Sequence, residues 1–275
     1  MKILYLIFLI NFVTFGNELP NSLIVPGGVI ELYVKSSSKP KAFHNKKELM
    51  VLKSSTKNRY RVIAGVKLDF DVDNKYEIVL KYDGKSYKKN VQIKSYDYKK
   101  QYIKLKTSKH VNLSSKNLSR YQKERKKSLN ALGLFSEKKF DTLNMMMPLH
   151  VELKDDFGKR RYFNNQPRKP HSGVDLAAKS GTKIYAPLSA KVVISEEFFF
   201  NGNTIYLDHG LGLVTVYAHL SKLNVKNGDM VKKGDVIGLV GKTGRVTGSH
   251  LHWGVALNGS MVNPKLFFPI IQTKK

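Results

Sequence analysis

Five side chains that bind metals or transfer protons gather in three short segments of the second half of the chain. "HSGVD" supplies His171 and Asp175, "VTVYAHL" contains His219, and "SHLHWGV" contains His250 and His252. Imidazole and carboxylate groups are the natural zinc ligands of a protein without cysteine, and this chain has none. Three protein ligands leave a fourth coordination position open, as in catalytic zinc sites, and two of the five groups then remain for proton transfer.

Strand geometry predicts which of these groups can meet. Side chains alternate across a strand, so His250 and His252 should face one side, about 6.6 Å apart along the backbone, with Leu251 on the other side. The alternating segment "LVTVYAH" places His219 on the face opposite its valines, where it could line the same cleft.

The remaining pair, His171 and Asp175, needs a bend. On a straight strand the two residues would lie roughly 13 Å apart, too far to bind one ion. Gly173 permits the bend, whereas Pro170 and the Ser-Gly-Val interior disfavour a helix.

The five groups favour a zinc hydrolase. The chain lacks the H-E-x-x-H motif and its glutamate base, so a histidine would have to accept the proton. A structural metal site and a set of core histidines without metal are the alternatives. Surface or core roles are expected for the four isolated histidines, which are His44, His110, His150 and His209.

The three segments together resemble the lysostaphin-type, or LytM-like, zinc metallopeptidases. The resemblance extends over about residues 145–267 and includes "GNTIYLDHGLGLVTVYAHLS", "VKKGDVIGLVGKTGRVTGSHLHWGV" and "NGSMVNP". It implies one zinc ion held by His171, Asp175 and His252. His219 and His250 would then be the unbound catalytic pair, with His250 accepting the proton of the attacking water and His219 stabilising the oxyanion, or the reverse.

The resemblance also implies a substrate, the peptide cross-links of bacterial peptidoglycan. We expect an endopeptidase of the D-alanyl–diaminopimelate cross-link, rather than of a glycine bridge or an uncross-linked stem peptide, acting in wall remodelling and in cell-shape or division control. Other cell-wall enzymes are possible partners. Two alternatives are an activator of a cell-wall amidase and a basic peptidoglycan-binding envelope protein without useful turnover.

The rest of the sequence predicts a mainly β protein in three parts. Short apolar alternations over residues 18–106, with an Asp83-Gly84 hairpin turn, predict a small antiparallel sandwich that resembles an immunoglobulin-like domain. Residues 107–144 should form a linker with a helix capped by Ser114 or Ser115 and ended by Gly133. Strands separated by glycine turns predict an all-β LytM-like domain, of the duplicated hybrid motif type, over residues 145–275.

The first residues and the net charge indicate location. Lys2 followed by an apolar stretch predicts a signal peptide over residues 1–17, with an uncleaved anchor as the alternative, and no later segment can span a membrane. We therefore expect a periplasmic or cell-envelope protein. The formal charge of +27 then favours an anionic polymer such as the cell wall, or simply solvated basic faces, and no nucleic-acid partner is expected.

Overall fold

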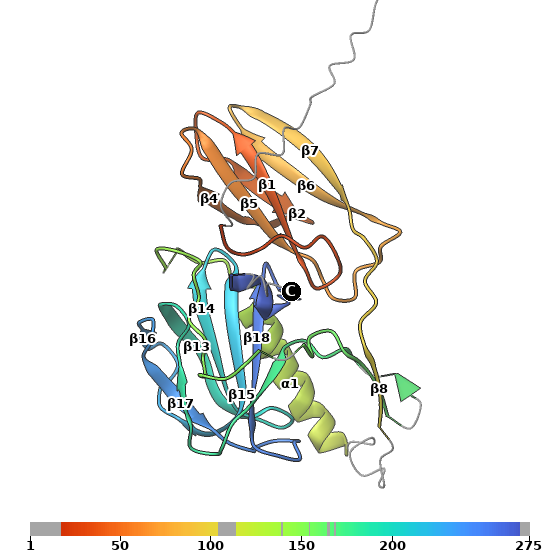
Figure 1. Ribbon diagram of the computed structural model, residues 1–275, viewed down its shortest axis with the longest axis vertical. Coiled ribbons are helices and arrows are strands. Elements are labelled where there is room, and N and C mark those ends of the chain that lie inside the picture. Colours follow the sequence, from red (N-terminus) through yellow and green to blue (C-terminus); the bar gives the residue numbers. More distant parts are fainter. Residues whose placement is uncertain are drawn as a thin grey trace, which may run out of the picture.

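The computed structural model describes residues 18–103, 114–138, 140–153, 155–163, 166–167 and 169–269. The predicted signal peptide lies outside these residues. The described chain forms a smaller β domain and a larger β domain, with one long helix against the larger one (Figure 1).

The N-terminal domain consists of two sheets around a shared apolar core. One sheet has the order β1-β5-β4 and the other the order β3-β2-β6-β7. Their bounds are β1 (Val29–Lys35), β2 (Lys41–His44), β3 (Lys47–Glu48), β4 (Met50–Lys53), β5 (Arg59–Gly65), β6 (Lys75–Tyr82) and β7 (Lys85–Gln92). Ile30, Val62 and Ile78 are among the fully buried side chains between the sheets. The predicted sandwich and the hairpin at Asp83-Gly84, where both residues have positive φ, are thus present.

The last strand expected in the sandwich lies elsewhere. Strand β8 (Lys100–Ile103) leaves the N-terminal domain and pairs in parallel with β9 (Arg160–Phe163), which also pairs with β10 (Gln166–Pro167). The apolar alternation of "YIKL" predicts a strand but not its partner, because pairing depends on where the chain later returns.

Helix α1 (Ser115–Leu132) follows the predicted capping pattern. The Ser114 side chain accepts a hydrogen bond from the Asn117 N–H, and Gly133 is the C-cap. Leu118 and Leu129 of this helix are exposed, because only the end of the helix around Ala131 is buried against the strands of the C-terminal domain.

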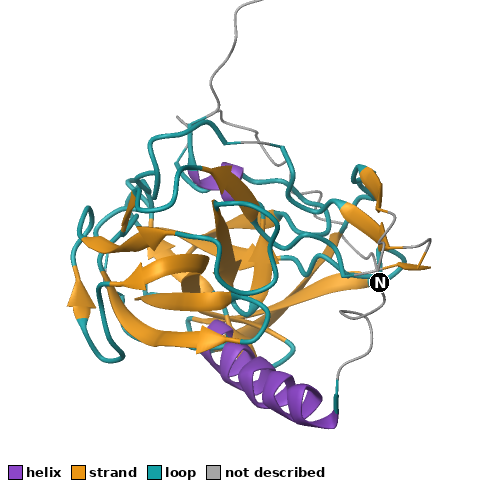
Figure 2. Ribbon diagram, turned by 90° about the horizontal axis from the view of Figure 1, so that it is seen from below, coloured by secondary structure: helices purple, strands orange, loops and turns teal. Residues whose placement is uncertain are grey.

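The C-terminal domain is a nine-stranded antiparallel sheet whose central path is β11-β18-β15-β14-β13-β16 (Figure 2). Its strands are β11 (Val174–Ala177), β12 (Lys183–Tyr185), β13 (Ala190–Phe198), β14 (Gly202–Gly210), β15 (Leu213–Leu223), β16 (Met230–Val231), β17 (Val236–Val240), β18 (His250–Leu257) and β19 (Ser260–Val262), followed by the 3-10 helix η1 (Pro264–Phe267). Most residues of strands β15 and β18 at its centre are buried, so this part of the domain is a closely packed base for the residues at the strand ends. No helix among the described residues is long and apolar enough to cross a membrane.

The two domains share a continuous core. Val29, Met50 and Ile63 of the sandwich belong to the same buried cluster as the centre of the C-terminal sheet. At the contact, the Asn258 side chain accepts a hydrogen bond from the Gly65 N–H at 2.8 Å and donates one to the Gly65 carbonyl at 3.3 Å. A Cβ on Gly65 would lie 2.9 Å from the side chains of Leu257 and Val262, so glycine permits the close approach.

We predict that Asn258→Gly lowers the free energy of unfolding by about 1–3 kcal/mol, because the Gly65 N–H loses its side-chain partner in a part-buried contact and the Gly65 carbonyl retains only the Tyr76 hydroxyl. Glycine tolerates the φ of 44° at this position, so backbone strain does not contribute. Urea unfolding measures the change. Asn58→Gly is the matched control, since Asn58 also has positive φ but is exposed, and equal stability of the two variants would contradict the assignment.

Candidate metal and catalytic site

Three potential ligand atoms form a small triangle. Oδ1 of Asp175 lies 3.0 Å from Nε2 of His171 and 2.9 Å from Nδ1 of His252, and the two nitrogens are 3.1 Å apart. Asp175 in β11 and His252 in β18 are paired directly across the sheet, and His171 precedes β11 after the predicted bend. The structure therefore brings together three of the five residues identified in the sequence.

The triangle has too few protons to satisfy the hydrogen-bonding capacity of all three atoms. Nδ1 of His171 donates a hydrogen bond to the Asp156 carbonyl at 2.9 Å, so in the uncharged form of the ring Nε2 carries a lone pair that faces the other two candidate ligand atoms. One cation can satisfy the lone pairs, and tetrahedral ligands at 2.0–2.1 Å from zinc lie about 3.3 Å apart. The donor set and its spacing thus fit a zinc ion, as the sequence predicted.

The protonation states suit metal binding. Burial raises the pKa of Asp175, but the adjoining His171 and His252 rings outweigh this effect and hold the pKa well below its usual range. Burial lowers the pKa of His252. At neutral pH the group therefore presents a carboxylate and a neutral imidazole, which are the forms that bind zinc.

Asp156 contacts two of the three candidate ligands. Its carbonyl accepts the His171 hydrogen bond, and its buried carboxylate accepts a hydrogen bond from the Asp175 N–H at 3.3 Å. No motif in the sequence identifies Asp156. Its position fifteen residues before His171 has no regular spacing, and only the close packing of the two segments reveals its role.

His219 lies beside the triangle in an unusual backbone conformation. Its φ is 70°, its N–H donates to the Asn201 carbonyl at 2.8 Å, and Nδ1 donates to the Thr243 carbonyl at 3.0 Å. Non-glycine residues rarely adopt this conformation, which costs on the order of 1 kcal/mol and is concentrated at functional sites. Burial lowers the pKa of His219 to about 4, so the ring is neutral at pH 7 with its lone pair on Nε2.

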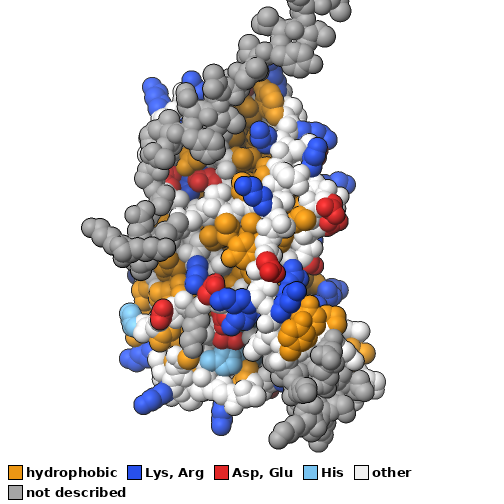
Figure 3. All heavy atoms as spheres, turned by 45° about the vertical axis from the view of Figure 1, so that its right-hand side comes forward, with side chains coloured by type: hydrophobic (Ala, Val, Ile, Leu, Met, Phe, Trp, Pro, Cys, Tyr) orange, Lys and Arg blue, Asp and Glu red, His pale blue; other side chains and the backbone are white. Residues whose placement is uncertain are grey.

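His250 completes the group. Its ring centroid lies 5.0 Å from that of His219, and its Nε2 lies 3.8 Å from Oδ1 of Asp175. Nδ1 of His250 donates to the Gly248 carbonyl at 2.9 Å, so Nε2 again carries the lone pair. All five residues identified in the sequence thus converge on one place. Figure 3 shows histidine side chains at the surface beside acidic ones on one face of the molecule.

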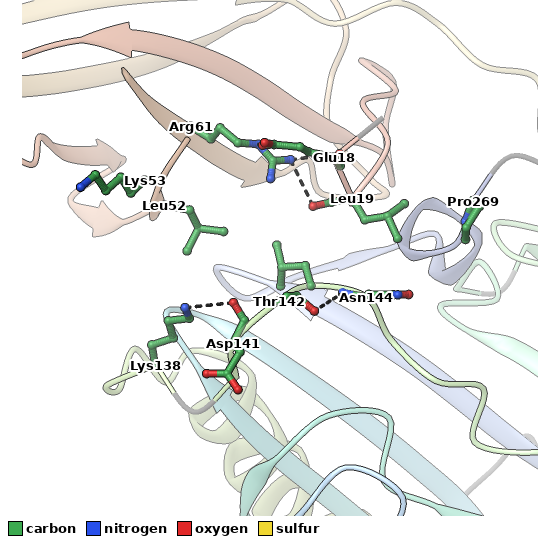
Figure 4. Close-up of a pocket in the computed structure, with 11 residues that line it drawn as sticks. Glu18, Leu19, Leu52, Lys53, Arg61, Lys138, Asp141, Thr142, Asn144 and Pro269 are labelled. Carbon is green, nitrogen blue, oxygen red and sulfur yellow. Dashed lines mark hydrogen bonds and ion pairs between the residues drawn. The ribbon is translucent and has the colours of Figure 1, made fainter. Parts of the chain in front are cut away.

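The other described histidines and a cavity between the domains lie apart from this group. His209 is fully buried between the Ser189 carbonyl and the Thr215 hydroxyl, and His44 stacks on Tyr76 in the N-terminal domain. His110 lies outside the described residues. A cavity of about 560 Å³ between the domains, lined by Arg61 and Asp141 among others, contains none of the five residues (Figure 4).

Residues 169–264 match the sequence profile of peptidase family M23. A crystal structure of a protein assigned to peptidase M23 from Pseudomonas aeruginosa is 30% identical, with a TM-score of 0.75, and the match covers 90% of this chain and 96% of that one.

Two curated relatives are similar over the C-terminal domain. The peptidoglycan DD-endopeptidase ShyA of Vibrio cholerae is 40% identical over 112 residues, which are 40% of this chain and 26% of ShyA. The DD-carboxypeptidase/endopeptidase Mpg of Neisseria meningitidis is 36% identical over 116 residues, which are 42% of this chain and 27% of Mpg. The matched segment thus spans about a quarter of the length of these relatives.

We predict that Gly173→Ala weakens zinc binding roughly 10–100-fold, in the range typical of changes next to metal ligands. A Cβ at this position would lie 2.8 Å from the His252 ring and 2.5 Å from the Trp253 carbonyl, so the ring must move. Competition with a chromophoric chelator measures the affinity. Gly248→Ala is the control because a Cβ there meets nothing within 4 Å, and equal affinities of the two variants would show that His252 tolerates displacement.

A second prediction concerns the stability of the metal-free protein. Because the pKa of His219 is lowered to about 4 in the folded state, the unfolded chain binds the extra proton first as the pH falls. The contribution of His219 to the free energy of unfolding, up to about 3 kcal/mol, is therefore fully present above about pH 6.5 and is lost as the pH falls towards 4. Asparagine accepts positive φ, so His219→Asn should lose less stability between pH 7.5 and 4.5 in urea titrations; an equal loss in both proteins would contradict this contribution.

Proposed function

The chain belongs to peptidase family M23, and on that basis we propose that it is a zinc-dependent endopeptidase that hydrolyses peptide cross-links of bacterial peptidoglycan. The observation that carries this proposal is the convergence of a His-Asp-His triangle with two further imidazoles that are directed at it. A purely structural metal site needs no such additional pair. The names of ShyA and Mpg support the class of substrate.

We assign zinc binding to His171, Asp175 and His252. When bound, the ion would polarise the scissile carbonyl and lower the pKa of the attacking water. The Asp156 carbonyl fixes the tautomer of His171, so that Nε2 is permanently available as a ligand atom. The β11–β18 pairing keeps Asp175 and His252 at their mutual distance without rearrangement.

His219 and His250 are the proposed proton-transfer pair. The low pKa of His219 makes its ring a poor base, so we assign acceptance of the water proton to Nε2 of His250. His219 then lies on the side of the substrate oxyanion, whose developing negative charge would raise the pKa of the ring, so that Nε2 takes up a proton from solvent and donates it in a hydrogen bond to the oxyanion. Hydrogen bonds from Nδ1 to backbone carbonyls hold both rings in place.

The finer features of the proposal concern the bond and the location. We propose cleavage of the D-alanyl–diaminopimelate cross-link, which agrees with the DD-endopeptidase names of the relatives. Residues 1–17 are proposed to direct export to the periplasm, where the basic surface would favour the anionic wall and other cell-wall enzymes are possible partners. Residues 18–106 are proposed to be an immunoglobulin-like domain, and the whole protein to act in wall remodelling and cell-shape or division control.

We predict two distinct classes of variant. Replacing His171, Asp175 or His252 by alanine removes both the bound zinc and the turnover, because each supplies one corner of the triangle. His219→Ala and His250→Ala keep the zinc but lose turnover by roughly 10²–10⁴-fold, the range for a group that transfers a proton. Zinc content and the conversion of cross-linked muropeptide dimers to monomers, followed by chromatography and mass analysis, measure both quantities.

The control is His150→Ala, which replaces an exposed histidine that only packs against Tyr185 and should change neither quantity. A His250→Ala protein that cleaves dimers normally would refute the role assigned to His250. Stimulation of an amidase by a variant that cannot cleave would instead support the activator alternative.

A further inference from the structure

A small sheet extends directly from the proposed active site. The His171 N–H donates to the Lys159 carbonyl at 3.0 Å, and the chain continues from Lys159 into β9, which pairs with β8 and β10. Tyr162 lies three residues beyond Lys159, so it is about 10 Å along the strand from the backbone of the first proposed zinc ligand. This three-stranded sheet, β10-β9-β8, projects at the side of the C-terminal domain (Figure 1).

One face of this sheet carries an ordered set of side chains. Lys100 lies opposite Arg160, and Tyr102 lies opposite Tyr162 two positions further along both strands. Residues two positions apart share a face, so the two cations and the two aromatic rings form adjacent rows on the same side. The rings are stacked, with centroids 4.7 Å apart and planes 17° apart, and Pro167 is paired with Tyr162 on the next strand.

This face lowers the stability of the fold unless it contacts another molecule. Tyr102 is 64% exposed although its ring is large and apolar, and among the described residues it is one of the two most exposed large hydrophobic side chains. Like charges directly opposite each other destabilise a strand pair, and no carboxylate of the described residues forms an ion pair with Lys100 or Arg160. The face therefore has both an apolar surface and uncompensated positive charge.

We propose that this face binds the glycan strand of peptidoglycan, with sugar rings packed on the Tyr102–Tyr162 pair and carboxylates of an adjoining stem peptide next to Lys100 and Arg160. This inference rests on the proposed function. The axial C–H groups of a pyranose form an apolar surface that fits the flat face of an aromatic ring. The cations match the carboxylates of the peptide chains that the glycan strand carries.

The proposal gives the N-terminal half of the chain a part in substrate binding. Strand β8 supplies Tyr102 and Lys100, whereas β9 supplies their partners and leads to His171. Tyr98, just before β8, is buried against Phe157, and its hydroxyl donates to the Pro26 carbonyl at 2.7 Å. A wall-binding face is thus held at a fixed distance from the metal group by both domains.

The test compares two substrates for each variant. Isolated sacculi carry the glycan strands, whereas a cross-linked stem-peptide dimer stripped of its sugars carries only the scissile bond. Tyr102→Ala is expected to raise the KM for sacculi about tenfold and to leave the KM for the sugar-free dimer within twofold of the unchanged protein. Tyr102→Phe retains the ring and should restore the KM for sacculi.

Tyr87→Ala is the matched control. Tyr87 is 39% exposed and stacks on Tyr82 with centroids 4.6 Å apart, but the pair lies on β6 and β7 in the N-terminal domain. It should not change the KM for either substrate. Lys100→Gln should weaken retention on sacculi at low ionic strength, and the difference from the unchanged protein should shrink in high salt because the contact is exposed.

Three outcomes would overturn the inference. An unchanged KM for sacculi in Tyr102→Ala shows that the ring does not bind the wall. An equal rise in the KM for both substrates shows that the ring serves the fold. A loss of the same size in Tyr87→Ala shows a general effect of surface rings. If the unchanged protein cleaves neither substrate, the proposed function fails, and co-sedimentation of Tyr102→Ala with sacculi still decides whether this face binds the wall.

Discussion

The structure depends on three electron-rich atoms held about 3 Å apart in a partly buried place. Nε2 of His171, Nδ1 of His252 and a carboxylate oxygen of Asp175 face one another, and the proton of His171 is committed to the Asp156 carbonyl. Such an arrangement is unfavourable unless a cation lies among the three atoms. The surrounding fold can be understood as the scaffold that keeps them together.

Several independent contacts hold these three atoms together. The pairing of β11 with β18 fixes two corners, and the close approach at Gly173 lets the third segment pack on the His252 ring. Asp156 forms hydrogen bonds with both His171 and Asp175. Gly158, next to Phe157, donates its N–H to the His171 carbonyl at 2.7 Å. A Cβ on Gly158 would overlap the Tyr98 ring, so the end of the N-terminal domain supports the segment that holds His171. Both halves of the chain therefore support the candidate metal group.

The sequence predicts the parts of this account that follow from local rules. Strand alternation places His250 and His252 on one side, Gly173 allows the bend before Asp175, and Ser114 and Gly133 mark the ends of α1. Long-range contacts could not be predicted in this way. The positive φ of His219 depends on backbone partners at Asn201 and Thr243, and β8 finds its partner nearly sixty residues later. The spacing of residues within one segment does not predict these long-range partners.

The central claim is that His171, Asp175 and His252 together hold a zinc ion. Anomalous diffraction at the zinc absorption edge, from crystals of the protein purified with zinc, tests it most directly. The account predicts one peak about 2.0–2.1 Å from Nε2 of His171, Oδ1 of Asp175 and Nδ1 of His252, with His219 and His250 outside bonding distance. A peak bonded to His219 or His250 in place of one of these ligands, or no peak in the group, would contradict it.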